Sequence, residues 1–225
     1  MLLTTDEQHY FKTNNTVVIP NAINNIGAKD AELSTKRGIS AGRIAPVKGF
    51  EYLITAWKIV IETHPEWTLD IYGDGDRNYI AQLNKQIETL DLKAHVFLKG
   101  ATNDLESEML ESSLYVMTSL TECFPMVLLE ALSIGTPVIS FDCPSGPSEL
   151  IIDGENGVLV ENQNFEALIT AMDKMHTDQV FYKHCKSKTQ STILSDGFSM
   201  TSFALFSDPP PFAAMYTSTL SPGTR

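Results

Sequence analysis

The stretch LYVMTSLTECFPMVLLEALSIGTPVISF, residues 114–141, decides the fold. It opens with a short run of strand formers at 114–117 and ends with a second apolar run at 137–141. Between the two runs, 124–134 is predicted to be helical, with a proline near its first position and a glycine directly after its end. Two short strands joined by one helix are typical of a parallel β-α-β crossover.

The same alternation extends over the chain from residue 37 to about residue 175. Strands are expected at 37–44, 67–72, 95–98, 114–117, 137–141 and 157–160, and helices at 50–63, 76–90, 104–112, 124–134, 147–152 and 165–175. This rhythm predicts an α/β fold with a doubly wound parallel sheet, Rossmann-like, and helices on both faces. Ligands of such sheets bind beyond the carboxyl ends of the strands, so the loops to watch are 45–49, 73–76, 99–103, 118–124 and 142–148.

Composition and charge narrow the function. Of 225 residues, 43% are hydrophobic and 20% charged, which is an ordinary globular composition and excludes collagen, coiled-coil and wholly disordered chains. No apolar run is long enough to span a membrane. The net charge of −12 argues against a nucleic-acid partner, and three scattered cysteines argue against a disulfide framework or a structural zinc site. We therefore expect a reducing, cytoplasmic location and no metal site.

The first candidate site is the segment Gly42–Phe50, GRIAPVKGF, where a strand ends, a glycine-bearing loop follows and a helix begins. This order puts Arg43 and Lys48 near the carboxyl edge of the sheet, beside a helix N-terminus. Two cations together with free backbone N–H groups suit a diphosphate. The alternative interpretation is two surface cations on an ordinary turn.

The second candidate site is the segment Thr118–Glu130, in which Glu122 precedes a helix and Glu130 lies within it. The amides in the first turn of that helix would attract an anion. The two carboxylates could accept hydrogen bonds from sugar hydroxyls on either side of a phosphate. The spacing of the two glutamates alone carries little information. The candidate site is indicated by the strand, turn and helix in which they stand.

The third candidate is the Pro- and Gly-rich segment Asp142–Glu149, whose backbone could approach a ligand closely; a rigid turn with a serine cap explains it equally well. A calcium or phosphate loop at Gly73–Asp76 is the weaker interpretation, since a tight turn followed by a helix cap also accounts for it. A phosphorylated receiver domain is disfavoured because neither Asp70 nor Asp142 stands at a strand end among other acids.

Taken together, these segments resemble the C-terminal, nucleotide-sugar-binding half of the retaining glycosyltransferases of family 4, which have the GT-B fold. The matching pieces follow one another in order over roughly residues 15–180: VVIPNAI at 17–23, GRI…KGF at 42–50, LDIYGDG at 69–75, VFLKG at 96–100, the E-x7-E segment at 122–130, GTPVI…DCPSGP at 135–147 and DGENG at 153–157.

The resemblance implies a role for each matching residue. Arg43 and Lys48, next to Gly42, would hold the donor diphosphate and act in catalysis together with Glu122, which would contact the transferred sugar. Glu130 would bind the ribose hydroxyls. The remaining donor contacts are implied for Phe124, Pro125, Met126 and Leu129 at the helix start, and for Phe97 and Lys99 near the base. The resemblance implies no metal and no cofactor, with a nucleotide sugar, UDP-linked by analogy with bacterial surface-glycan enzymes, as substrate.

The resemblance also implies a division of the chain and an activity. Residues 1–30 would be the end of an N-terminal domain and the inter-domain linker, 31–180 the nucleotide-sugar-binding domain, and 181–225 a poorly ordered tail. The enzyme would transfer a hexose, with retention, from a UDP-sugar to a glycan or lipid-linked acceptor in surface polysaccharide synthesis, either in the cytoplasm or at the inner face of the membrane. A separate N-terminal domain would bind the acceptor. The alternative is a truncated, non-catalytic fragment that only binds nucleotide sugars.

Overall fold

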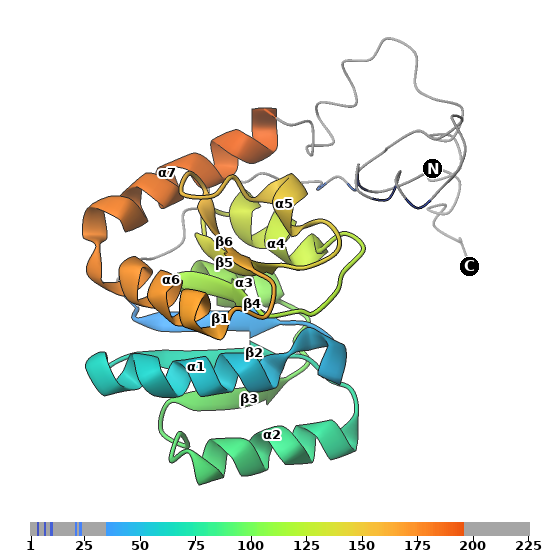
Figure 1. The fold of residues 1–225 in the computed structure, drawn as a ribbon, viewed down its shortest axis with the longest axis vertical. Coiled ribbons are helices and arrows are strands. Elements are labelled where there is room, and N and C mark those ends of the chain that lie inside the picture. Colours follow the sequence, from blue (N-terminus) through green and yellow to red (C-terminus); the bar gives the residue numbers. More distant parts are fainter. Residues whose placement is uncertain are drawn as a thin grey trace, which may run out of the picture.

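The computed structural model describes residues 35–195, together with residues 4, 7, 10, 21 and 23. Most of the segment 1–30, expected to be the end of an N-terminal domain and a linker, and residues 196–225 of the expected tail lie outside the described residues. Within the described part, helices and strands alternate along the chain as the apolar periodicity predicts (Figure 1). The helices are α1 (Phe50–Thr63), α2 (Arg77–Thr89), α3 (Leu105–Leu110), α4 (Met126–Ser133), α5 (Pro147–Leu150), α6 (Phe165–Thr177) and α7 (Gln179–Ser195).

The strands form one parallel sheet in the described residues, in the order β3-β2-β1-β4-β5-β6. Their bounds are β1 Arg37–Ala41, β2 Thr68–Tyr72, β3 Val96–Gly100, β4 Leu114–Met117, β5 Val138–Asp142 and β6 Gly157–Glu161. This is the doubly wound, Rossmann-like sheet that the sequence predicts. The chain winds outward from β1 to β3, then returns to the middle and winds outward from β4 to β6.

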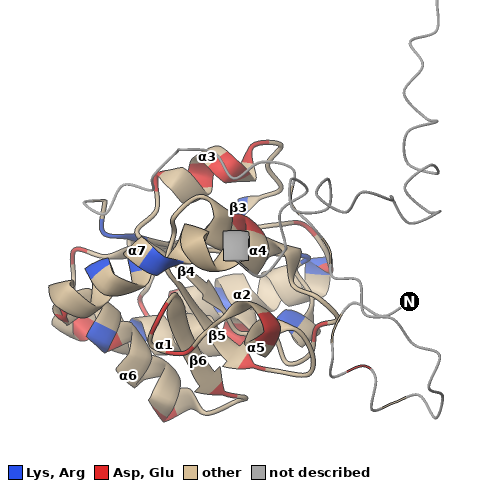
Figure 2. Cartoon of the chain, turned by 90° about the horizontal axis from the view of Figure 1, so that it is seen from above, with Lys and Arg blue, Asp and Glu red and all other residues tan. Residues whose placement is uncertain are grey.

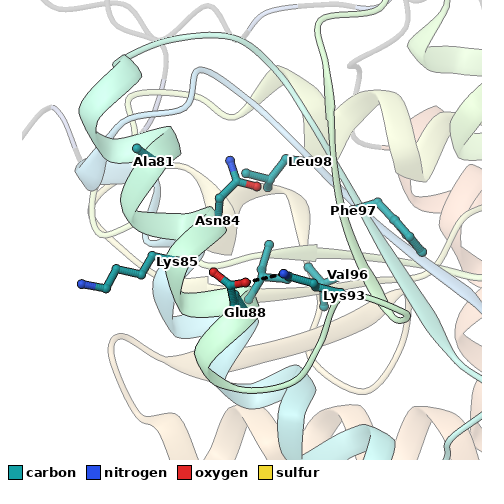
Figure 3. A pocket seen from close by; sticks show the side chains of 9 residues that line it. Ala81, Asn84, Lys85, Glu88, Lys93, Val96, Phe97 and Leu98 are labelled. Atoms are coloured by element: carbon teal, nitrogen blue, oxygen red, sulfur yellow. Dashed lines mark hydrogen bonds and ion pairs between the residues drawn. The ribbon is translucent and has the colours of Figure 1, made fainter.

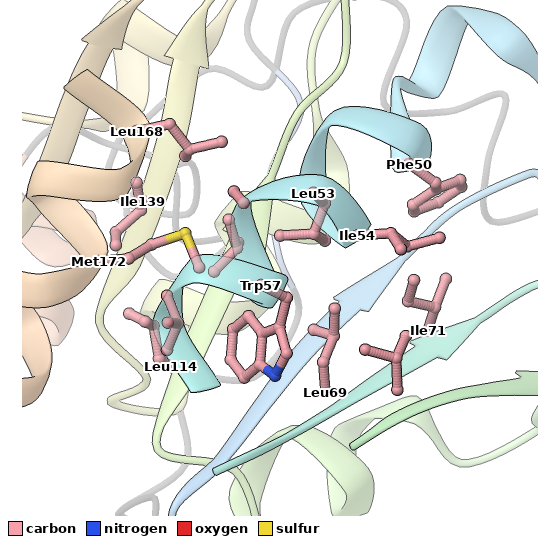
Figure 4. Packing of buried hydrophobic residues seen from close by; sticks show 14 of the residues in the cluster. Phe50, Leu53, Ile54, Trp57, Leu69, Ile71, Leu114, Ile139, Leu168 and Met172 are labelled. Atoms are coloured by element: carbon pink, nitrogen blue, oxygen red, sulfur yellow. The ribbon is translucent and has the colours of Figure 1, made fainter. Parts of the chain in front are cut away.

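Each face of the sheet carries its own core. On one face α1, α2 and α6 bury a cluster centred on Trp57, which is fully enclosed and packs with Leu53, Leu69 and Met172 (Figure 4). On the other face α3, α4 and α5 cover a second cluster that includes Ile39 and Tyr115. Helices on both faces leave the carboxyl ends of the strands as the accessible edge of the sheet, which is where ligands bind in this architecture.

Most boundaries differ from those expected by one or two residues, and two of the differences affect the loops at the carboxyl edge of the sheet. The first strand ends at Ala41 and not at 44, because beyond Ala41 the backbone leaves the sheet and only Ile44 returns, to an isolated bridge with Gly75. The helix expected at 124–134 begins at Met126, with Pro125 as its N-cap. Both changes lengthen the loops at the carboxyl edge of the sheet.

The prediction that a poorly ordered tail begins at 181 is wrong for residues 181–195, which lie in α7. Tyr182, Cys185, Thr189 and Ile193 are buried and recur at steps of three and four residues, so they form one face of that helix. The polar composition of the segment concealed this face, since one of its four members is a threonine and another a cysteine.

Candidate active site at the switch point of the sheet

The centre of the sheet is its switch point. β1 and β4 are neighbours, yet β1 is followed by β2 on one side and β4 by β5 on the other. The loops 42–49 and 118–125 therefore leave adjacent strands and diverge over opposite faces. A crevice at this point is where doubly wound sheets hold nucleotides.

The two loops are tied together by their backbones. The Leu120 amide donates to the Val47 carbonyl at 2.8 Å, and the Thr118 hydroxyl donates to the Gly49 carbonyl at 2.9 Å. Gly49 has φ +61°, and a Cβ there would lie 2.2 Å from the Thr118 carbonyl oxygen. Only glycine satisfies both demands, so the close approach of the loops depends on this residue.

The structure brings Lys48 and Glu122 together, one from each loop. The Lys48 ammonium forms an ion pair with the Glu122 carboxylate, and the side chains are 21% and 12% exposed. The Lys48 chain runs over Gly42, where a Cβ would lie 3.6 Å from Lys48 Cε. The cation and the acid that the resemblance assigns to the diphosphate and the sugar are thus direct partners.

Arg43, in the same loop as Lys48, lines a hollow of about 220 Å³ whose walls include neither Lys48 nor Glu122. It is exposed and has no hydrogen bond or ion pair within the described residues. The walls of the hollow also include Tyr72 at the end of β2, Gly73 and Asp74 after it, Thr102 after β3, and Val127 in the first turn of α4. Within the described residues Arg43 is therefore a cation without a protein partner, placed where the loops after three strands meet one helix.

The N-terminus of α4 faces the same region. In the described part of the chain the amides of Met126 and Val127 have no hydrogen-bond acceptor, and Pro125 before them has no N–H. Such amides carry the positive end of the helix dipole. Phe124 is buried, and Leu129 has no exposed surface on either its side chain or its main chain.

Glu130 is half-buried one turn further along α4, and burial raises the pKa of its carboxyl. Burial raises the pKa of the Tyr115 phenol, and the carboxylates of Glu122 and Glu130 add to the rise. Glu122 lies in the loop after β4, and Glu130 lies in α4, the helix that follows this loop.

Phe97 and Lys99, by contrast, do not reach the hollow. Phe97 lies at the edge strand and lines a different groove, of about 650 Å³, between β3 and α2 (Figure 3). The Lys99 ammonium is 3.8 Å from Asp70. The residues after β3 that line the hollow are Ala101, Thr102 and Leu105, which the sequence analysis did not single out.

Tyr72 was also missed, although its place at the end of a strand, directly before Gly73, was a usable signal. Its hydroxyl accepts from Arg37 at 2.9 Å, and Arg37 also donates to Asp70 at 2.8 Å. Burial, together with the neighbouring Glu108, raises the pKa of Tyr72, so the phenol stays neutral. This partly buried network fixes one wall of the hollow from behind.

The loop after β5 supports the loop after β4. The Glu122 amide donates to the Pro144 carbonyl at 2.7 Å, and the Ser145 amide donates to the Glu122 carbonyl at 2.8 Å. The segment 142–149 therefore holds the main chain of Glu122 in place. These hydrogen bonds indicate that the segment 142–149 supports the Glu122 loop and does not itself contact the ligand.

Acidic side chains lie on α3 and α5 (Figure 2). Lys48 and Arg43 are thus cations of an acidic protein, and Lys48 is already paired with Glu122. The described residues include no group of three His, Cys, Asp or Glu side chains that could hold a metal ion, and none of the described helices is long and apolar enough to cross a membrane.

The family profile described as "Glycosyl transferases group 1" matches residues 25–192. The chain belongs to this family of glycosyltransferases. Its fold is that of a GT-B C-terminal domain: the C-terminal domain of a group 1 protein from Francisella tularensis matches with a TM-score of 0.65 and 22% identity, covering 76% of this chain and 89% of that one.

Relatives in the family carry more specific names. An uncharacterized glycosyltransferase of Haemophilus influenzae is 32% identical over 81% of this chain and 52% of its own length. A poly(glycerol-phosphate) alpha-glucosyltransferase of Bacillus subtilis is 32% identical over 74% of this chain and 24% of its own. The chain thus spans about half or less of these two relatives.

Among solved structures, TarM of Staphylococcus aureus, in a complex that includes UDP, matches with a TM-score of 0.79 and 28% identity over 86% of this chain and 40% of that one. HepE of Anabaena, in complex with UDP and glucose, matches with a TM-score of 0.73 and 25% identity over 82% of this chain and 53% of that one. Both are bound to a nucleoside diphosphate.

Proposed function

We propose that this glycosyltransferase chain binds a UDP-sugar at the switch point and supplies the donor half of a retaining transfer to a glycan or lipid-linked acceptor of surface polysaccharide synthesis. The observation that carries the proposal is the Lys48–Glu122 pair, which joins the loops after β1 and β4. Arg43 of the first loop and Val127 of α4 line one hollow, and within the described residues the amides of Met126 and Val127 have no acceptor. Breaking the bond between sugar and phosphate leaves negative charge on the diphosphate. Preorganised cations and amides stabilise such charge in a closed site.

Each part of the site has a defined task in this proposal. Lys48, Arg43 and the amides of Met126 and Val127 hold the diphosphate. Glu122 turns from Lys48 toward the hydroxyls of the transferred sugar, and Glu130 accepts from the ribose hydroxyls. The relatives crystallised with UDP support the choice of nucleotide.

The alternative is a nucleotide-sugar-binding chain that does not transfer sugar by itself. The chain corresponds to 52% of the length of the Haemophilus relative and to less of the Bacillus enzyme. Both proposals require UDP binding. Only the first requires that radiolabelled sugar move from UDP-glucose or UDP-N-acetylglucosamine to an acceptor, with the chain alone or joined to an acceptor-binding domain.

Calorimetric titration with UDP tests the site itself. Lys48→Glu reverses the charge at the centre of the site and should abolish binding. Lys183→Glu makes the same change of charge on an exposed residue of α7 and should leave binding unchanged. Equal UDP affinity of wild type and Lys48→Glu would reject the proposed site.

A further inference from the structure

The two central strands separate earlier than any other pair of neighbours in the sheet. β1 and β2 are in register over five residues, from Arg37↔Thr68 to Ala41↔Tyr72, whereas β1 and β4 pair only at Gly38↔Leu114 and Ile39↔Tyr115. Beyond that point β1 continues to Ala41 without a partner on the β4 side. The crevice that receives the nucleotide begins at this separation.

Because β4 does not pair with Ala41, the amide and carbonyl of Ala41 need other hydrogen-bond partners inside the protein. The side chain of Tyr115 supplies them. The Ala41 amide donates to the Tyr115 hydroxyl oxygen at 3.2 Å, and the same hydroxyl donates to the Ala41 carbonyl oxygen at 2.9 Å. One hydroxyl thus makes both hydrogen bonds that a paired strand would have made.

The surroundings hold this hydroxyl firmly. Tyr115 is fully buried, and its ring packs in the cluster formed with Ile39, Tyr72 and the inner face of α4. Burial raises the pKa of its phenol, as do the carboxylates of Glu122 and Glu130, so the group keeps its proton and remains a donor. The hydroxyl therefore remains a hydrogen-bond donor at neutral pH.

We propose that Tyr115 is a positioning residue for the donor site: its hydroxyl holds the carboxyl end of β1 apart from β4 and so sets where the loop from Gly42 to Lys48 stands relative to the loop that carries Glu122. The inference rests on the proposed UDP site. Gly42 and Arg43 follow Ala41 directly, so a shift of Ala41 moves the guanidinium that lines the hollow. Without the hydroxyl, the orphaned amide and carbonyl can regain partners only if β1 moves toward β4 or if water enters.

Tyr115→Phe removes only the hydroxyl, and Tyr182→Phe is its matched control. Tyr182 is likewise buried and donates through its hydroxyl to a backbone carbonyl, that of Ser113, but at the opposite end of β4. The full chain is titrated with UDP by calorimetry well below the melting temperature of each variant. Tyr115→Phe should bind UDP at least tenfold more weakly than wild type, and Tyr182→Phe should bind like wild type, although both lose thermal stability.

A purely structural role for Tyr115 would lower the melting temperature without this difference in affinity. Wild-type affinity in Tyr115→Phe, or equal weakening in both variants, would overturn the inference. If the folded wild type does not bind UDP, the proposed function fails and not this inference alone.

A second measurement does not require the variant to fold. In the wild-type chain the Ala41 amide should exchange with deuterium as slowly as the amide of Ile39 inside the sheet. Fast exchange at Ala41 would mean that the tyrosine does not hold the strand, and would equally overturn the inference.

Discussion

The Lys48–Glu122 ion pair predicts that the Glu122 carboxylate competes with a bound diphosphate for the Lys48 ammonium. A diphosphate must take the Lys48 ammonium away from Glu122 before the cation can act on it. Glu122→Gln removes that competition and also removes a negative charge close to the incoming phosphates. We therefore expect this substitution to tighten UDP binding, although it removes a residue of the proposed active site.

The magnitude follows from how far the pair is withdrawn from water. Exposed ion pairs are worth at most about 1 kcal/mol, and breaking a fully buried one costs roughly 3–5 kcal/mol. With side chains 21% and 12% exposed, this pair falls between the two limits. Loss of the competition should contribute about 1–2 kcal/mol, or around tenfold in the dissociation constant of UDP.

Isothermal titration of both proteins with UDP measures the effect. Glu66→Gln is the control, since it makes the same change of net charge at an exposed pair with Lys36, at the other end of the strands. The gain for a UDP-sugar should be smaller than for UDP, because the contact between Glu122 and the sugar is lost. Unchanged or weaker UDP binding by Glu122→Gln would refute the competition.

Two further predictions concern the support of the site and the far end of the sheet. Gly146→Ala should destabilise the fold and weaken UDP binding, because Gly146 has φ +104° and a Cβ there would lie 2.6 Å from Pro125 Cδ. Gly154→Ala is the control, since Gly154 has φ +76° but no atom within 4 Å of the added Cβ. It should lower the free energy of unfolding in urea by about 1 kcal/mol and leave UDP binding unchanged. Equal effects on UDP binding would show that the loops do not support each other. Burial lowers the pKa of His176 from 6.5 to about 4, so the unfolded chain takes up a proton that the folded chain refuses, and stability should fall by up to roughly 3 kcal/mol as the pH drops from 6.5 to below 4. His176→Phe should show a smaller loss in urea unfolding at pH 7 and 4.5, and an identical pH dependence would contradict this explanation.

The alternation of strands and helices was predictable because each element buries an apolar face with its own period. The helix of Phe50 and Trp57 and the strand of Leu69 and Ile71 show those periods in sequence, and the structure buries all four side chains. Helix α7 was missed because its buried face is not wholly apolar. Its buried stripe includes Thr189, and a hydroxyl residue does not register as apolar when a sequence is scored by hydrophobicity.

The site was predictable in its loops and less so in its side chains. Lys48 and Glu122 stand on loops that parallel strand order brings together, so their proximity followed from topology. That they bond to each other did not, because it depends on the path of the lysine chain over Gly42. The placement of Phe97 failed because a residue on an edge strand can serve a groove on either side of the sheet.

The loops at the switch point are held by hydrogen bonds to one another, although they lie far apart in the sequence. The loop of Lys48 is held by Thr118 and Leu120, and the loop of Glu122 is held by Pro144 and Ser145. The backbone entropy of these loops is lost on folding, so a ligand need not order them when it binds. The rearrangement that remains is the exchange of the Lys48 partner from carboxylate to phosphate. This leaves the side chains around that lysine as the place where affinity for the donor can change without rebuilding the fold.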